Sequence, residues 1–163
     1  MTTANAASAR DLENTLYIDL EFGRVVIELM PQVAPNHVAR IKELAREGYY
    51  DGIVFHRVVP DFVAQTGDPT GTGRGGSGKN IKAEFSNVPF ERGTVGMARA
   101  ANPNSADSQF FICFRAAPFL NGQYTVFGKV VEGMDHVDSI APGEPPRYPD
   151  KMLKVQVAAD VKE

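Results

Sequence analysis

The chain has 163 residues, of which 43% are hydrophobic and 23% charged, and its formal net charge is −3 with a sequence pI near 5.6. These values are ordinary for a soluble protein of one domain, so they exclude a disordered or membrane-embedded chain, and no apolar run approaches the length of a membrane span. The slightly acidic balance also argues against nucleic acid as a partner, because phosphate binding depends on clustered Lys and Arg.

Residues 1–14 are predicted to form a flexible N-terminal tail, followed by one domain over residues 15–163. The leader is rich in Ala, Thr and Ser but lacks the apolar core of a signal peptide, and acidic residues follow at once, so we expect a cytoplasmic protein. Cys113 is the only cysteine, so no intramolecular disulfide can form. Its apolar neighbours predict a buried thiol that serves as a small hydrophobic group.

The first predicted elements are a hairpin and a helix. Apolar and polar residues alternate over residues 16–22 and again over residues 25–29, which is the pattern of two strands with one buried face. Pro35 suits a first helical turn, apolar residues then recur at helical spacing, and Gly48 supplies a stop. We therefore expect an amphipathic helix over residues 35–47.

Short strand-like runs follow, separated by stretches rich in Gly, Pro and Asn. They cover residues 53–59, 62–66, 94–98, 109–114, 125–131 and 154–161. A second helix is predicted over residues 134–140, where Met134, Val137 and Ile140 share a face. Many short strands joined by loops are typical of a β-sandwich or β-barrel, so the fold is predicted to be mainly β.

A glycine-rich segment resembles two nucleotide-binding motifs in its letters only. Residues 71–76 match a dinucleotide-binding loop, and residues 73–80 nearly match a phosphate-binding loop. However, Asn80 stands where the phosphate loop needs Ser or Thr, and no helix pattern begins there, so we predict a flexible surface loop. The three histidines lie far apart and there is one cysteine, so we expect no metal site.

Two segments place polar side chains inside apolar, strand-like stretches. Residues 55–68 read FHRVVPDFVAQTGD, in which the cation of Arg57 and the amide of Gln65 are unusual. Residues 108–114 read SQFFICF, in which the amide of Gln109 adjoins consecutive aromatic residues. Two such strands suit the walls of one apolar cleft that carries a few polar groups.

Together with VFGKV at residues 126–130, these motifs resemble those of the cyclophilins, a family of peptidyl-prolyl cis-trans isomerases. The resemblance runs over residues 16–161 in family order and spacing, and MAR at residues 97–99 with the lack of Trp is similar to the small bacterial cytoplasmic members. It implies a closed eight-stranded antiparallel β-barrel capped by two α-helices. It also implies a monomer that needs no cofactor and no metal.

The resemblance places a substrate cleft on the outer face of this barrel. By motif position the catalytic residues are Arg57, Phe62 and Gln65. The substrate-binding residues are Val63, Ala98, Arg99, Gln109, Phe111, Phe119, Leu120 and Tyr124. Four of these depart from the best-known family pattern: Val63 replaces Met, Arg99 replaces Asn, Phe119 replaces Trp and Tyr124 replaces His. Loss of the indole N–H at Phe119 is expected to weaken binding of cyclosporin, the family's inhibitor, while activity survives.

The implied activity is rotation about X-Pro bonds in proline-containing polypeptides, which assists protein folding. Amide resonance opposes this rotation with a barrier of roughly 18 to 20 kcal/mol. A guanidinium aimed at the amide nitrogen stabilises the twisted bond, in which the lone pair is localised, and Arg57 is expected to act in this way with Gln65 orienting it. A non-catalytic module for proline peptides and a holdase chaperone are the alternatives. Arg57 and Gln65 favour the enzyme, because docking an apolar ring needs no cation.

Overall fold

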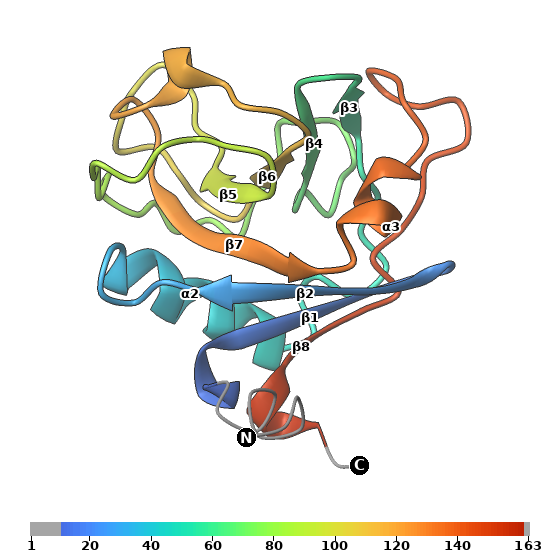
Figure 1. The fold of residues 1–163 in the computed structure, drawn as a ribbon, viewed down its shortest axis with the longest axis horizontal. Helices are drawn as coiled ribbons and strands as arrows, with labels where there is room; N and C mark the ends of the chain where they lie inside the picture. Colours follow the sequence, from blue (N-terminus) through green and yellow to red (C-terminus); the bar gives the residue numbers. More distant parts are fainter. Residues whose placement is uncertain (1–10, 162–163) are drawn as a thin grey trace, which may run out of the picture.

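The structure is a computed structural model that describes residues 11–161, and its main feature is one curled, eight-stranded antiparallel sheet (Figure 1). The strands are β1 (Thr15–Leu20), β2 (Gly23–Leu29), β3 (Arg57–Val59), β4 (Val63–Thr66), β5 (Thr94–Met97), β6 (Phe110–Cys113), β7 (Val126–Glu132) and β8 (Lys154–Val157). Their order across the sheet is β3-β4-β6-β5-β7-β2-β1-β8. The helices are α2 (Pro35–Arg46) and α3 (Met134–Asp138), and short 3-10 turns are η1 (Leu12–Asn14), η2 (Pro118–Leu120) and η3 (Ala158–Asp160).

The predicted elements are present, with shifted ends. The hairpin is β1–β2, in which Leu16 pairs with Ile27 and Ile18 with Val25, and all four side chains are buried. The predicted helix is α2, which packs against β8. The run at residues 53–59 is strand only in β3, and the last strand stops at the end of β8, where η3 begins.

The expectation of a closed barrel is wrong, because the edge strands β3 and β8 form no ladder with each other. Among the described residues, this seam is crossed by isolated bonds, such as that from the Phe55 N–H to the Asp150 carbonyl (2.9 Å) and the two between Val58 and Gly143. The segment of residues 142–149 that faces β3 contains four prolines. Proline has no N–H to extend a ladder, so the sheet stays an open half-barrel.

The predicted N-terminal tail falls partly outside the described residues, which begin at residue 11. Its last residues form η1, where the carboxylate of Glu13 accepts a hydrogen bond from Arg46 of α2 at 2.9 Å. The division of the chain at residue 15 stays a prediction. None of the helices within residues 11–161 is long and apolar enough to cross a membrane.

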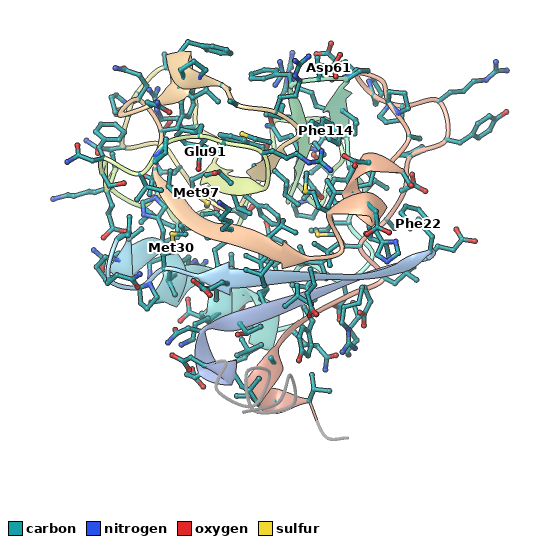
Figure 2. All side chains as sticks on the ribbon, viewed as in Figure 1. Phe22, Met30, Asp61, Glu91, Met97 and Phe114 are labelled. Carbon is teal, nitrogen blue, oxygen red and sulfur yellow. The ribbon has the colours of Figure 1, made fainter. Side chains whose placement is uncertain are left out.

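The curled sheet separates two hydrophobic clusters, one on each face. The larger cluster fills the inside of the sheet and includes Ile41 of α2, Met97 of β5 and Phe110 of β6. Figure 2 shows Met97 in this interior, whereas Phe22 lies at the tip of the β1–β2 hairpin, where its side chain is 38% exposed. Because side chains alternate along a strand, Phe110 points into this core and its neighbour Phe111 points to the other face.

The smaller cluster lies on the outer face of β4 and β6 and forms the base of the candidate site. Its buried members are Val63, Phe90, Phe111, Cys113, Ala117, Leu120 and Val126. The prediction of a buried thiol is confirmed, since Cys113 is 0% exposed and burial raises its pKa to about 12. The thiol is therefore uncharged and serves as packing.

Candidate active site

The register of three neighbouring strands brings the predicted polar and aromatic residues into one row. Arg57 of β3 pairs with Gln65 of β4, and Gln65 pairs with Phe111 of β6. Directly paired residues point to the same face of a sheet, so all three lie on the outer face above the smaller cluster. The two motifs of the sequence analysis therefore do form walls of one cleft.

The cleft is a cavity of about 290 Å³ on this outer face. It is lined by Arg57, Phe62, Val63, Gln65, Ala98, Arg99, Phe111, Leu120 and Tyr124. Of the eleven predicted site residues, only Gln109 and Phe119 are outside this lining. Gln109 lines the adjoining cavity, and the ring of Phe119 packs at the rim on that of Phe62, with centroids 5.5 Å apart and 69% of Phe119 exposed.

The guanidinium of Arg57 lies at the rim of this cavity and is held from two sides. Its Nη1 donates to Oε1 of Gln65 at 3.4 Å, and its Nε donates to Oε1 of Glu144 at 3.0 Å. Its Cζ lies 5.8 Å from the centroid of the Phe62 ring. The ion pair with Glu144 is exposed to solvent, with 40% and 58% of the two side chains accessible. The guanidinium therefore keeps further N–H groups for a ligand beside the aromatic wall.

Glu144 was missed by the sequence analysis. It lies 87 residues from Arg57 in a loop with no motif of its own, and only the contact between that loop and β3 brings it to the site. Gly143 makes this contact through two hydrogen bonds with Val58, of 2.8 and 2.9 Å. No local pattern in the sequence reports such a bridge.

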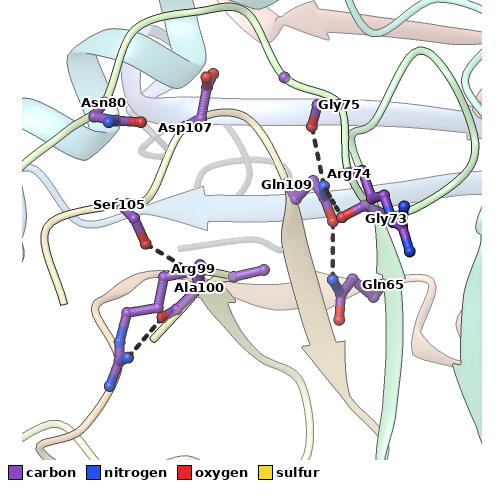
Figure 3. A pocket seen from close by; sticks show the side chains of 12 residues that line it. Gln65, Gly73, Arg74, Gly75, Asn80, Arg99, Ala100, Ser105, Asp107 and Gln109 are labelled. Carbon is purple, nitrogen blue, oxygen red and sulfur yellow. Dashed lines mark hydrogen bonds between the residues drawn. The ribbon is translucent and has the colours of Figure 1, made fainter. Parts of the chain in front are cut away.

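Two side-chain amides, those of Gln65 and Gln109, connect Arg57 to the adjoining cavity. Nε2 of Gln65 donates to Oε1 of Gln109 at 3.0 Å. Nε2 of Gln109 donates in turn to the carbonyl oxygens of Gly73 and Gly75, at 2.9 and 3.0 Å (Figure 3). The glycine-rich segment is thus connected to Arg57 through two side-chain amides.

Aromatic rings form the apolar wall of the cleft. Phe111 stacks on Phe90, with centroids 5.7 Å apart, and meets Tyr124 edge to face at 5.9 Å. Leu120 is 7% exposed and closes the base. Such packing fixes the shape of the wall before any ligand arrives.

Arg99 does not reach into the cleft as a free cation. Its guanidinium lies over the ring of Tyr124, 4.5 Å from the centroid, and its Nη2 donates to the carbonyl of Gln123 at 2.7 Å. A further bond runs from its Nη1 to the carbonyl of Ala100 at 3.0 Å. The guanidinium therefore connects two loops. The aliphatic part of the side chain and the backbone of Arg99 are the parts that remain to line the cleft.

A second, larger cavity of about 490 Å³ adjoins the first (Figure 3). The two cavities share Gln65, Ala98 and Arg99. Residues of the glycine-rich segment form one side of the second cavity. Within residues 11–161, no group of three His, Cys, Asp or Glu side chains is placed to hold a metal ion.

Comparison with known proteins identifies the family. The profile of the family described as cyclophilin type peptidyl-prolyl cis-trans isomerase matches residues 15–157. A probable peptidyl-prolyl cis-trans isomerase of Brucella suis is 54% identical over 173 residues, which covers 96% of this chain and 88% of the relative. Peptidyl-prolyl cis-trans isomerase B of Bacillus subtilis is 46% identical over 133 residues, which covers 80% of this chain and 92% of the relative.

Solved structures agree with this assignment. A crystal structure of a cyclophilin from Hirschia baltica has a TM-score of 0.88 and 28% identity, and covers 99% of this chain and 82% of its own. A cyclophilin type isomerase from Cryptosporidium parvum, crystallised in the presence of the dipeptide Ala-Pro, has a TM-score of 0.82 and 30% identity, and covers 88% of this chain and 98% of its own. The chain therefore belongs to the cyclophilin-type peptidyl-prolyl cis-trans isomerases.

Proposed function

We propose that the 290 Å³ cleft binds a proline residue of a polypeptide and catalyses rotation about the preceding peptide bond without covalent chemistry. The observation that supports this most directly is that Arg57, a permanent cation, lines the same cavity as the apolar side chains of Phe62, Phe111 and Leu120. A relative of the same fold was crystallised in the presence of Ala-Pro. A cleft that only docked an apolar ring would have no use for a cation.

Arg57 would act on the electron distribution of the peptide bond. As the bond twists, the nitrogen lone pair leaves conjugation and becomes a hydrogen-bond acceptor, which a guanidinium can stabilise. This interaction exists only in the twisted state, so it lowers the barrier rather than tightening ground-state binding.

The apolar wall has to supply the remainder of the rate enhancement. Bringing a process of tens of seconds to milliseconds requires about four decades, or roughly 5.5 kcal/mol. One charge-assisted hydrogen bond contributes about 1.5 to 3 kcal/mol. Phe62, Phe111 and Leu120 would seat the proline ring and hold one side of the bond while the other turns, in a site with little water. Gln65 would orient Arg57 and bind the substrate backbone.

The proposal has further parts. The substrates are flexible, proline-containing segments of other proteins, and the activity assists their folding. The protein acts as a monomer in the cytoplasm. Cyclosporin binds weakly, because Phe119 has no N–H to donate.

The test is NMR exchange spectroscopy on a short Ala-Pro peptide. Arg57→Ala should lower the catalysed exchange rate at least tenfold with the fold intact, because the cation proposed to stabilise the twisted amide is lost. Arg115→Ala is the matched control, since Arg115 is 67% exposed and lies outside both cavities. Cyclosporin should inhibit the wild type only at high concentration.

Three outcomes would contradict the proposal. An exchange rate unchanged by Arg57→Ala would reject catalysis by this residue. Peptide binding without catalysis in the wild type would indicate a docking module. Suppression of aggregation that survives Arg57→Ala, in a protein without isomerase activity, would indicate a holdase.

A further inference from the structure

Residues 69–76, which include the first part of the glycine-rich segment, are organised around one buried carboxylate. Asp68 is 0% exposed, and its oxygens accept hydrogen bonds from the backbone N–H groups of Thr70 (2.8 Å), Gly73 (2.7 Å) and Gly75 (3.0 Å) and from the Thr70 hydroxyl (2.8 Å). Burial by itself raises the pKa of this carboxyl, but these donors outweigh it and hold the pKa well below the usual range. The backbone of residues 69–76 is thus held in place by the ionised carboxylate of Asp68.

The path of the backbone around Asp68 explains two of the glycines. A Cβ at residue 75 would lie 2.1 Å from Oδ1 of Asp68, and Gly73 has φ of +88°, a conformation that other residues rarely adopt. The glycines that make this segment resemble a nucleotide-binding loop therefore allow the backbone to wrap around Asp68. In this wrap the carbonyls of Gly73 and Gly75 turn toward Gln109.

Those two carbonyls determine the direction of the amides that lead to Arg57. A carbonyl oxygen only accepts hydrogen bonds, so the NH₂ group of Gln109 must face the segment and its Oε1 must face Gln65. Gln65 must then donate through Nε2, at 3.0 Å, and present its own Oε1 to Nη1 of Arg57. Reversal of the Gln65 amide would place its NH₂ against the guanidinium, two donors facing each other. Reversal of the Gln109 amide would place its Oε1 against the two carbonyl oxygens and its NH₂ against that of Gln65.

We propose that Asp68 and the segment it anchors, residues 69–76, form a positioning element for Arg57. Asp68 holds the two carbonyls, these set the direction of the Gln109 and Gln65 amides, and the last amide oxygen holds the guanidinium toward the cleft. Asp68 touches neither substrate nor Arg57. The inference rests on the proposed function, because it assigns a role within the same isomerase site.

The experiment compares Asp68→Asn and Thr70→Val with wild type. Loosening the segment should lower kcat on the Ala-Pro peptide by about three- to tenfold, the equivalent of one hydrogen bond, and leave KM nearly unchanged. Thr70→Val should lose less, and Thr70→Ser, which keeps the hydroxyl, should retain wild-type kcat. Asp51→Asn is the matched control, because Asp51 also accepts from a backbone N–H, that of Val155 at 2.9 Å, far from the cleft.

Two further readouts separate positioning from general destabilisation. The side-chain NH₂ signals of Gln65 and Gln109 should shift or broaden in Asp68→Asn and Thr70→Val but not in Asp51→Asn. In an Arg57→Ala background, Asp68→Asn should cause no additional loss of rate, because the group it positions is gone.

The outcomes are decisive in each direction. A folded Asp68→Asn protein with faster amide exchange at residues 73 and 75 but unchanged kcat would overturn the inference, as would an equal loss in the Arg57→Ala background. If Asp68→Asn does not fold, the contrast between Thr70→Val and Thr70→Ser decides alone. Absence of isomerase activity in the wild type would instead refute the proposed function.

Discussion

Arg57, the proposed catalytic cation, is shared between a neutral amide and an acidic side chain. Glu144 reaches its Nε because Gly143 is bonded to Val58 on the adjoining strand. A Cβ at residue 143 would lie 2.5 Å from Cα of Pro146, and φ there is +144°, so the loop requires glycine at this point. The carboxylate of Glu144 helps to hold the guanidinium of Arg57 in place. Because this carboxylate is exposed to solvent, it weakens the positive charge of the guanidinium only slightly.

This arrangement predicts a small effect of Glu144 on catalysis. An exposed ion pair contributes about 0 to 1 kcal/mol, so Glu144→Ala should lower kcat/KM by no more than about fivefold, far less than Arg57→Ala. Glu144→Gln keeps an acceptor for Nε and should stay closer to wild type than Glu144→Ala. The exchange assay measures both. An increase in rate in Glu144→Ala would show instead that the carboxylate restrains Arg57.

At the scale of elements, helix α2 depends on a cap supplied from elsewhere in the chain. The residue at its N-cap, Ala34, has no side chain to accept hydrogen bonds. Glu84 replaces it: one oxygen accepts from the N–H of His37 at 2.8 Å, and the other from that of Asn36 at 3.2 Å. The same carboxylate meets Nδ1 of His37 at 2.6 Å. A negative charge at the N-terminus of α2 also stabilises the helix through its dipole.

Removing this cap should weaken the whole domain. Glu84→Ala leaves two backbone N–H groups and one buried ring nitrogen without their acceptor, so we expect the free energy of unfolding to fall by about 1 to 2 kcal/mol. Urea unfolding measures this loss. Glu91→Ala is the control, because Glu91 is 58% exposed and lies 3.8 Å from Lys129. Equal losses in the two variants would contradict the capping role.

At the scale of the whole molecule, buried titratable groups make stability depend on pH. His37 and His56 are 0% and 6% exposed, and burial lowers the pKa of both imidazoles below 6.5, although Glu84 opposes the shift at His37. The unfolded chain therefore takes up protons first as the pH falls. Burial raises the pKa of Glu84, but hydrogen bonds from His37 and Asn36 outweigh it, so the pKa is lowered. Its contribution is present above the unfolded pKa and lost on acidification.

Acid should therefore destabilise the protein in two stages. The free energy of unfolding should be steady near neutral pH and decline below about pH 6.5, as the histidines of the unfolded chain become protonated. It should decline again below about pH 4.5, as Glu84 of the unfolded chain becomes protonated. Urea titrations across this range test the profile. His37→Gln should reduce the first stage to the part that His56 contributes, and a profile that rises on acidification from pH 6.5 would contradict the assignment.

Much of the architecture was predictable because its signals are local. The hairpin and α2 appear as periods of two and of 3.6 in hydrophobicity. Nine of the eleven candidate residues that the family resemblance implied line one cavity. The prediction that the sheet closes was wrong, because closure depends on whether β3 and β8 pair. A proline-rich segment that begins 83 residues after β3 lies beside it instead.

The elements, the family and the identity of the candidate catalytic cation could all be inferred from the amino-acid sequence, since periodicity and motif spacing are properties of neighbouring residues. The atoms that hold this cation could not be inferred in that way, because they come from distant parts of the chain. Glu144 lies 87 residues from Arg57, and Gln109 lies 44 from Gln65 and 36 from Gly73. Such hydrogen bonds form only when strand register and loop path bring donor and acceptor within about 3 Å, a condition set by the packing of the whole chain.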